Sequence, residues 1–230
     1  MWKAIHRAEW RLRLFVFAAL LLMAAAASGR TLILPPDAPP ITAAGRALIV
    51  EYEGWAGRPE LPDRRYSGVS WGWGWDSHQN SKANCLRYWG ALPAPQAERL
   101  AETHPFYGQS AVEPTKKVRD IIIPRWLGDE VFDKIDLAKT YDECKRAFPG
   151  FGTLRPNAQA AVISLVFNRG ASTVGANRKE MREMRDAIAK QDYAGIASSI
   201  RRSKRVWRGT SIQAGMTRRR EAEARLVETP

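Results

Sequence analysis

Apolar residues recur with a helical period along most of the chain after residue 42. Residues 156–168 are apolar on nearly every side, which predicts a central buried helix that Gly170 ends. Thr42 is placed to cap a first helix over residues 43–53, and Gly54 to end it. The same period predicts further helices over residues 96–103, 115–126 as far as Pro124, 129–148, 179–190, 193–202 and 217–227. The pattern is typical of one mostly helical domain.

Residues 57–81 lack this period, and residues 69–75 alternate instead, which is the signal of a β-strand. Residues two apart on a strand share a face. One face would carry Ser70, Gly72, Gly74 and Asp76, and the other Val69, Trp71, Trp73 and Trp75. Glycines within a strand leave room for a ligand or another chain. The alternative is a tight glycine-rich hairpin whose tryptophans belong to the core.

The first residues have the three parts of a secretory signal. Residues 1–13 are basic, residues 14–27 are an unbroken apolar run, and small residues follow at the end of that run. The run is shorter than the roughly 18 residues of a membrane span. We expect residues 1–27 to be a cleaved signal peptide or an uncleaved inner-membrane anchor, rather than a core helix. The protein would then be periplasmic or secreted, with a Pro-rich linker over residues 28–42 and one domain over residues 43–228.

The composition is strongly basic, with 36 Lys and Arg against 24 Asp and Glu, a net charge of +12. Such a charge favours a polyanionic partner. Export and the lack of a nucleic-acid module argue against nucleic acid. The bases gather in a C-terminal basic segment, which we define as residues 201–225. This segment is either a solvated helix face with local ion pairs or a surface that attracts anionic wall or membrane polymers.

Cysteine and histidine are scarce. The chain has two cysteines and three histidines, without an HExxH or CxxC motif, so we expect no metal and no cofactor. In an oxidising compartment Cys85 and Cys144 could form a disulfide; otherwise they are two buried thiols.

Two carboxylates stand out. Glu53 precedes Gly54 and Trp55 at the end of the first predicted helix. A carboxyl partly buried beside apolar surface has a raised pKa, as a general acid requires, although a Glu at a helix end is most often simply exposed. Glu53 and Asp76 facing each other across a cleft would form the carboxylate pair of a glycoside hydrolase.

Four segments resemble the phage T4-type lysozymes (glycoside hydrolase family 24) in family order. Glu53-Gly54 and then SGVSWGWGWD at 67–76 resemble E-G and SGVT-I-G-x-G-x-D of the pesticin-like branch. AQAAVISLVFNRG at 158–170 resembles QxDALVSFAFNxG, and GMTRRREAEARL at 215–226, preceded by DYAG at 192–195, resembles GLxxRRxAExxLF. Ser70 stands where the family has Thr. Phage enzymes of the wider family place the Asp before the Thr, which makes Asp63 the alternative second carboxylate.

The resemblance implies an α+β, mostly α fold, with a larger helical lobe and a small β-hairpin lobe flanking a cleft. It implies a lysozyme that cleaves the β-1,4 bond between N-acetylmuramic acid and N-acetylglucosamine. Glu53 would protonate the leaving oxygen, Asp76 would stabilise positive charge and polarise a water, and Ser70 would position that water. Gly72, Gly74 and Trp75 would contact the glycan strand. We expect a monomer. The alternative is a non-catalytic peptidoglycan-binding protein on a degenerate lysozyme fold.

Overall fold

The computed structural model describes residues 39–230, which form two compact units. The first unit is Ala56–Val131. The second unit combines the described residues before Ala56 with Phe132–Pro230. The predicted signal or anchor, and the linker up to residue 38, lie outside the described residues. Within residues 39–230, every helix is too short or too polar to span a membrane.

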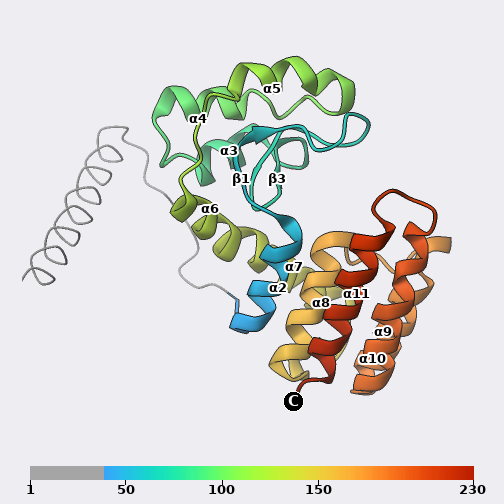
Figure 1. Ribbon diagram of the computed structural model, residues 1–230. Helices are drawn as coiled ribbons and strands as arrows, with labels where there is room; N and C mark the ends of the chain where they lie inside the picture. The colour runs from blue at the N-terminus through green and yellow to red at the C-terminus, as the bar shows by residue number, and fades with distance from the viewer. Residues whose placement is uncertain (1–38) are drawn as a thin grey trace, which may run out of the picture. The chain divides into compact units, whose positions relative to one another are not determined.

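The first unit contains a small antiparallel sheet (Figure 1). Its strands β1 (Ala56–Glu60), β2 (Ser70–Gly72) and β3 (Trp75–Asp76) follow one another in sequence order. Ser70 pairs with Asp76 and Trp71 pairs with Trp75 across β2 and β3. The sequence did not indicate β1, because Pro59 and Gly57 interrupt any alternation there.

The alternating stretch over residues 69–75 is the tight glycine-rich hairpin of the alternative interpretation and not one continuous strand. Gly72 and Gly74 have φ values of 66° and 87°, which side-chain-bearing residues rarely adopt. These two glycines let the chain reverse between β2 and β3. The tryptophans are buried, as the alternative interpretation expected.

Four helices and two short 3₁₀ turns complete the first unit. They are η1 (Ser77–Gln79), α3 (Lys82–Tyr88), α4 (Ala94–Ala101), η2 (Gly108–Ala111), α5 (Val112–Val118) and α6 (Arg125–Val131). The helix expected over residues 115–126 stops at Val118, and α6 begins directly after Pro124. Trp89, directly after the last residue of α3, meets Trp71 and Trp75 edge-on, with ring centroids 5.6 and 5.7 Å apart. These rings form much of the core of this unit.

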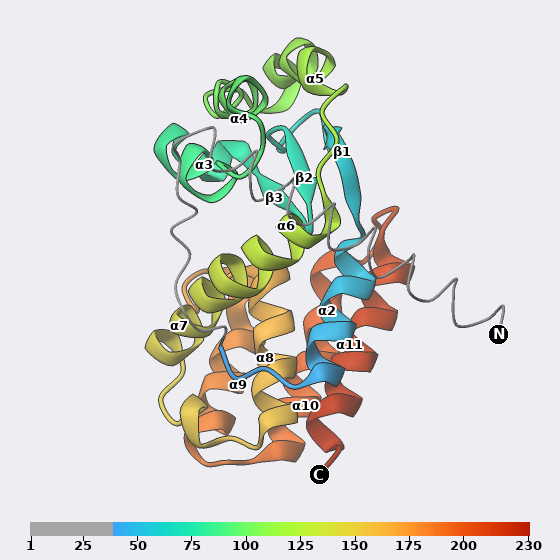
Figure 2. The same cartoon turned by 90° about the vertical axis from the view of Figure 1, so that its left-hand side faces the viewer.

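The second unit is helical (Figure 2). It contains α2 (Ala43–Glu53), the π-helical turn η3 (Phe132–Asp136), α7 (Leu137–Ala147), η4 (Phe151–Thr153), α8 (Pro156–Arg169), η5 (Ala176–Arg178), α9 (Lys179–Ala189), α10 (Tyr193–Arg202), η6 (Ser203–Trp207) and α11 (Gln213–Glu228). The predicted central helix is α8, which packs against α2, α7 and α11. A side chain at Gly45 would overlap Ala160, so α2 lies close against α8.

Several local predictions are confirmed. The limits of α2 and α10 match the expected ranges, the Thr42 hydroxyl accepts the Gly45 amide at 3.1 Å, and Gly170 ends α8. The fold class, α+β and mostly α, is also confirmed. The unit with the hairpin is more helical than expected, since α3 was not predicted.

Cys85 on α3 and Cys144 on α7 are free, buried thiols. Burial raises the pKa of the Cys85 thiol to about 12, and the pKa of Cys144 is raised for the same reason. Of the two alternatives for these residues, the structure has the unpaired one.

Candidate active site

Glu53 is the last residue of α2 and belongs to the second unit. Its carboxylate accepts a hydrogen bond from the Arg219 guanidinium at 2.7 Å, and its side chain is 17% exposed. Gly54, with φ of 72°, turns the chain away immediately after it. Glu53 is therefore held from one side by a cation while part of its carboxyl remains open to solvent.

Arg219 on α11 is itself fixed on several sides. It donates to Glu223 at 3.2 Å and to the Ser164 carbonyl on α8 at 3.1 Å, and it lies 5.7 Å from the centroid of the Tyr52 ring. Its side chain is only 3% exposed. A buried guanidinium with this many partners has little freedom to move, so the orientation of Glu53 is fixed too.

Glu223 is the centre of this buried network. It accepts hydrogen bonds from Ser164 at 2.6 Å and from Arg220 at 2.8 Å, in addition to Arg219. Burial lowers the pKa of Arg220 to about 10, although the Glu223 charge opposes this shift. Two guanidinium groups thus share one buried carboxylate, and Glu53 supplies the second carboxylate near this pair.

Ser70 and Asp76 lie in the first unit, on paired strands. The Asp76 carboxylate accepts the backbone amides of Gly68 at 3.0 Å and His78 at 2.9 Å, and so caps η1. The buried Ser70 hydroxyl donates to the Gly68 carbonyl at 3.3 Å. The structure brings these two predicted residues together across a hairpin, where the sequence had placed them along one strand.

Gly68 makes this arrangement possible. A Cβ atom there would lie 2.3 Å from a carboxylate oxygen of Asp76 and 2.8 Å from the His78 amide nitrogen. The Asp76 carboxylate therefore reaches the backbone only because residue 68 has no side chain.

The predicted glycan contacts have structural roles in the hairpin. Trp75 is 3% exposed and packs edge-on against Tyr88 and Trp89. Gly72 and Gly74 are the positive-φ residues of the turn, and only Gly74 is exposed.

Asp63, the alternative second carboxylate, lies on an exposed turn of the first unit. The Arg65 backbone amide donates to it at 2.6 Å, and this hydrogen bond together with the Arg65 guanidinium lowers the pKa of Asp63. Its side chain is 39% exposed, and its ion-pair partner is Arg65.

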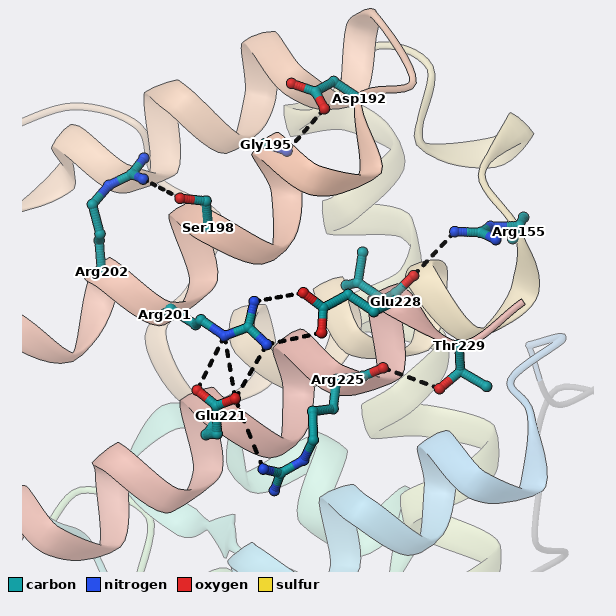
Figure 3. A network of polar contacts seen from close by, with 11 residues as sticks. Arg155, Asp192, Gly195, Ser198, Arg201, Arg202, Glu221, Arg225, Glu228 and Thr229 are labelled. Carbon is teal, nitrogen blue, oxygen red and sulfur yellow. Dashed lines mark hydrogen bonds and ion pairs between the residues drawn. The ribbon is translucent and has the colours of Figure 1, made fainter.

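The C-terminal basic segment is not one solvated face. Arg219 and Arg220 are buried, and Arg201 binds Glu221 at 3.0 Å and Glu228 at 2.6 Å (Figure 3). Figure 3 also shows Arg225 beside Glu221. The bases that keep uncompensated charge lie elsewhere in the segment.

Sequence reasoning did not identify Arg219 as a partner of Glu53. The i,i+4 spacing of Arg219 and Glu223 was visible, but it indicated only a local ion pair. The contact with Glu53 joins residues far apart in the chain, and no local pattern encodes it. Across residues 39–230, no cluster of three or more His, Cys, Asp or Glu residues could hold a metal ion.

Comparison with known proteins assigns a family to this fold. Residues 107–223 match the family described as phage lysozyme. No curated protein matches the chain. Among solved structures, the active form of the phage P1 endolysin Lyz is similar over 91% of this chain and 92% of that one, with 14% identity and a TM-score of 0.47.

Proposed function

The chain belongs to the phage lysozyme family, and we propose that it is a muramidase that hydrolyses the β-1,4 bond between N-acetylmuramic acid and N-acetylglucosamine. Family membership supports peptidoglycan hydrolysis in general. The observation that carries the finer proposal is the 2.7 Å contact between Glu53 and Arg219. Arg219 lies inside residues 107–223, which match the family, and Glu53 lies outside them, so this contact links the predicted acid to the matched segment.

In this proposal Glu53 protonates the leaving glycosidic oxygen. Asp76 stabilises the developing positive charge and, with Ser70, holds the attacking water on the opposite face of the sugar. Asp76 uses one acceptor site on each oxygen for a backbone amide, and a carboxylate has about four such sites. Asp76 can therefore still accept a hydrogen bond from water. Inversion would require carboxyls about 6.5–9.5 Å apart.

The first test replaces the proposed acid. Purified protein would be incubated with purified peptidoglycan, and released muropeptides would be identified by mass. Glu53→Gln should lower product release by about 100-fold or more, the usual contribution of a general acid. Glu51→Gln, at an exposed position of the same helix, is the matched control and should keep activity. Anhydro-muramic products would instead identify a lytic transglycosylase and contradict the role of water.

The second test separates the two candidate second carboxylates. If Asp76 acts with Ser70, Asp76→Asn and Ser70→Ala should both lose activity, and Asp63→Asn should retain it. Ser70→Thr should also retain it, because the hydroxyl stays. Because Asp76 also accepts two backbone amides, urea unfolding of each variant must show a folded protein. Loss of activity only in Asp63→Asn would move the role to Asp63.

One observation favours the non-catalytic alternative, namely the structural use of both Asp76 oxygens as backbone acceptors. A protein that binds sacculi without releasing any muropeptide would establish that alternative. The two cases are separated by measuring binding and product release on the same sample.

We also propose that the protein is exported through residues 1–27. Cell fractionation should find the full chain outside the cytoplasm. A variant that lacks the apolar run at 14–27 should stay in the cytoplasm. Equal distribution of both forms would contradict export.

A further inference from the structure

The second unit contains a cavity of about 420 Å³, lined by the start of α9, the end of α10, η6 and the first turns of α11. This volume is within the range of sites that hold small organic ligands. Five cations and one carboxylate supply the charged part of its lining: Lys179, Arg202, Lys204, Arg205, Arg208 and Glu180. Four of these cations, Arg202, Lys204, Arg205 and Arg208, belong to the C-terminal basic segment.

Only some of these charges have partners of opposite sign. The buried Glu180 binds Arg205, and Glu183 binds Arg202 at 2.8 Å and lies 3.8 Å from Lys179. Lys204 and Arg208 form no ion pair within the described part of the chain. Glu180 and Glu183 are therefore the two carboxylates that oppose five lining cations, and the cavity keeps an excess of positive charge.

Neighbouring groups show the same crowding of cations. The pKa of Arg169 is lowered, first by its burial and then by the charge of Arg178, with Arg205 contributing as well. Arg178 donates a hydrogen bond to the Arg169 backbone carbonyl at 2.6 Å. Arg205 donates one to the Ala176 backbone carbonyl at 3.3 Å. In the cavity lining itself, Arg202 and Arg205 are held in position by carboxylates, which lowers the ordering cost of binding an anion there.

We propose that this cavity binds the phosphate group of an anionic ligand. Guanidinium groups present paired N–H donors that match phosphate oxygens, and a lysine adds a point charge. Two or more uncompensated cations suit a phosphate better than a single-charged carboxylate. The two remaining lining residues, Gln213 and Thr217, add neutral donors. The phosphate could belong to a lipid headgroup or to a small soluble compound, and the site is independent of the muramidase reaction.

The test compares two double variants of equal charge. Lys204→Ala/Arg208→Ala removes the cavity cations that lack an ion pair. Lys145→Ala/Arg146→Ala removes one lysine and one arginine from exposed positions on α7 of the same unit. Calorimetry with inorganic pyrophosphate would probe a soluble ligand. Sedimentation with phosphatidylglycerol vesicles, against vesicles of phosphatidylcholine alone, would probe a lipid headgroup.

We expect the cavity variant to weaken binding about tenfold or more at low salt, since charge-assisted hydrogen bonds are lost. The control should change binding less than about twofold, and added salt should weaken the wild type. Binding of pyrophosphate would assign a soluble ligand, and binding of anionic vesicles alone would assign a lipid. Equal loss in both variants would show a general charge effect and overturn the site, as would a wild type that binds neither probe.

Muropeptide release from purified peptidoglycan is measured on the same proteins. The cavity variant should keep this activity, because none of its changes involves the carboxylates proposed for catalysis. A wild type that binds phosphate but releases no muropeptide would refute the muramidase proposal and leave this one standing. Muropeptide release without phosphate binding would do the reverse.

Discussion

Glu53 and Asp76 are the two proposed catalytic carboxylates, and the protein holds them by different means. Glu53 is bound by a guanidinium that belongs to a buried charged network on α8 and α11. Asp76 is bound by two backbone amides of its own hairpin. A carboxylate held by backbone amides depends only on local folding, whereas one held by a buried arginine depends on the packing of distant helices.

This difference predicts which substitutions would displace each carboxylate. In the second unit the weak point is a buried charge, since removing one partner leaves the others unpaired in a dry environment. In the first unit the weak point is backbone geometry, since the amides reach Asp76 only because residue 68 is glycine.

The largest expected effect comes from Glu223→Ala. It leaves Arg219 and Arg220 buried beside each other without their shared carboxylate, which should cost about 3–5 kcal/mol of unfolding free energy. Urea unfolding measures this change. Glu221→Ala, two residues earlier on α11 and more exposed, should cost less than about 1 kcal/mol. Similar losses in both variants would mean that the buried network is not what holds Arg219.

Gly68→Ala should have an intermediate effect. Its Cβ would displace the Asp76 carboxylate, and we expect a loss of about 2–3 kcal/mol from the clash and the two lost hydrogen bonds. Gly215→Ala in α11 is the control, because its added Cβ would meet no other part of the protein within 4 Å, and it should stabilise the protein by up to about 1 kcal/mol. If Gly68→Ala were as stable as wild type, the position of the Asp76 carboxylate would not require a residue without a side chain at position 68.

Asp136 is a third carboxylate, and it is held neither by a buried arginine, as Glu53 is, nor by backbone amides, as Asp76 is. Its substitution should have the smallest effect on stability. Its side chain does not cap α7, and burial raises its pKa to about 7, with Lys139 opposing the shift. A raised pKa in the folded state means that the protonated form is favoured there. Its stabilising contribution is therefore complete below about pH 4 and is lost as pH rises through about 7.

Asp136→Asn should remove that dependence. At pH 8 the variant should be more stable than wild type by about 1–2 kcal/mol, and at pH 4 the two should be equal. Thermal unfolding at both pH values measures the difference. Asp133→Asn, in the same π-helical turn, loses the 2.6 Å contact with Arg46 and should not gain stability at pH 8. A gain in both variants would point to net charge instead.

Local signals determined a large part of the secondary structure. The limits of α2, α8 and α10 follow from apolar period and capping residues, which act within a few positions of the chain. The alternation over residues 69–75 correctly indicated extended backbone. It left a single strand and a tight hairpin as alternatives, because the two strands continue one alternating pattern through the turn at Gly72 and Gly74.

The sequence by itself also determined which side chains to consider, since Glu53, Ser70 and Asp76 stand in recognisable motifs. Only the tertiary structure decided their partners. Burial placed Arg219 and Arg220 of the basic segment in a network in which Arg219 holds Glu53, and folding left Lys204 and Arg208 without an ion pair at a cavity. The physical reason is that charge is read locally in a sequence, whereas the energy of a charge depends on its distance from water and from partners that folding brings together.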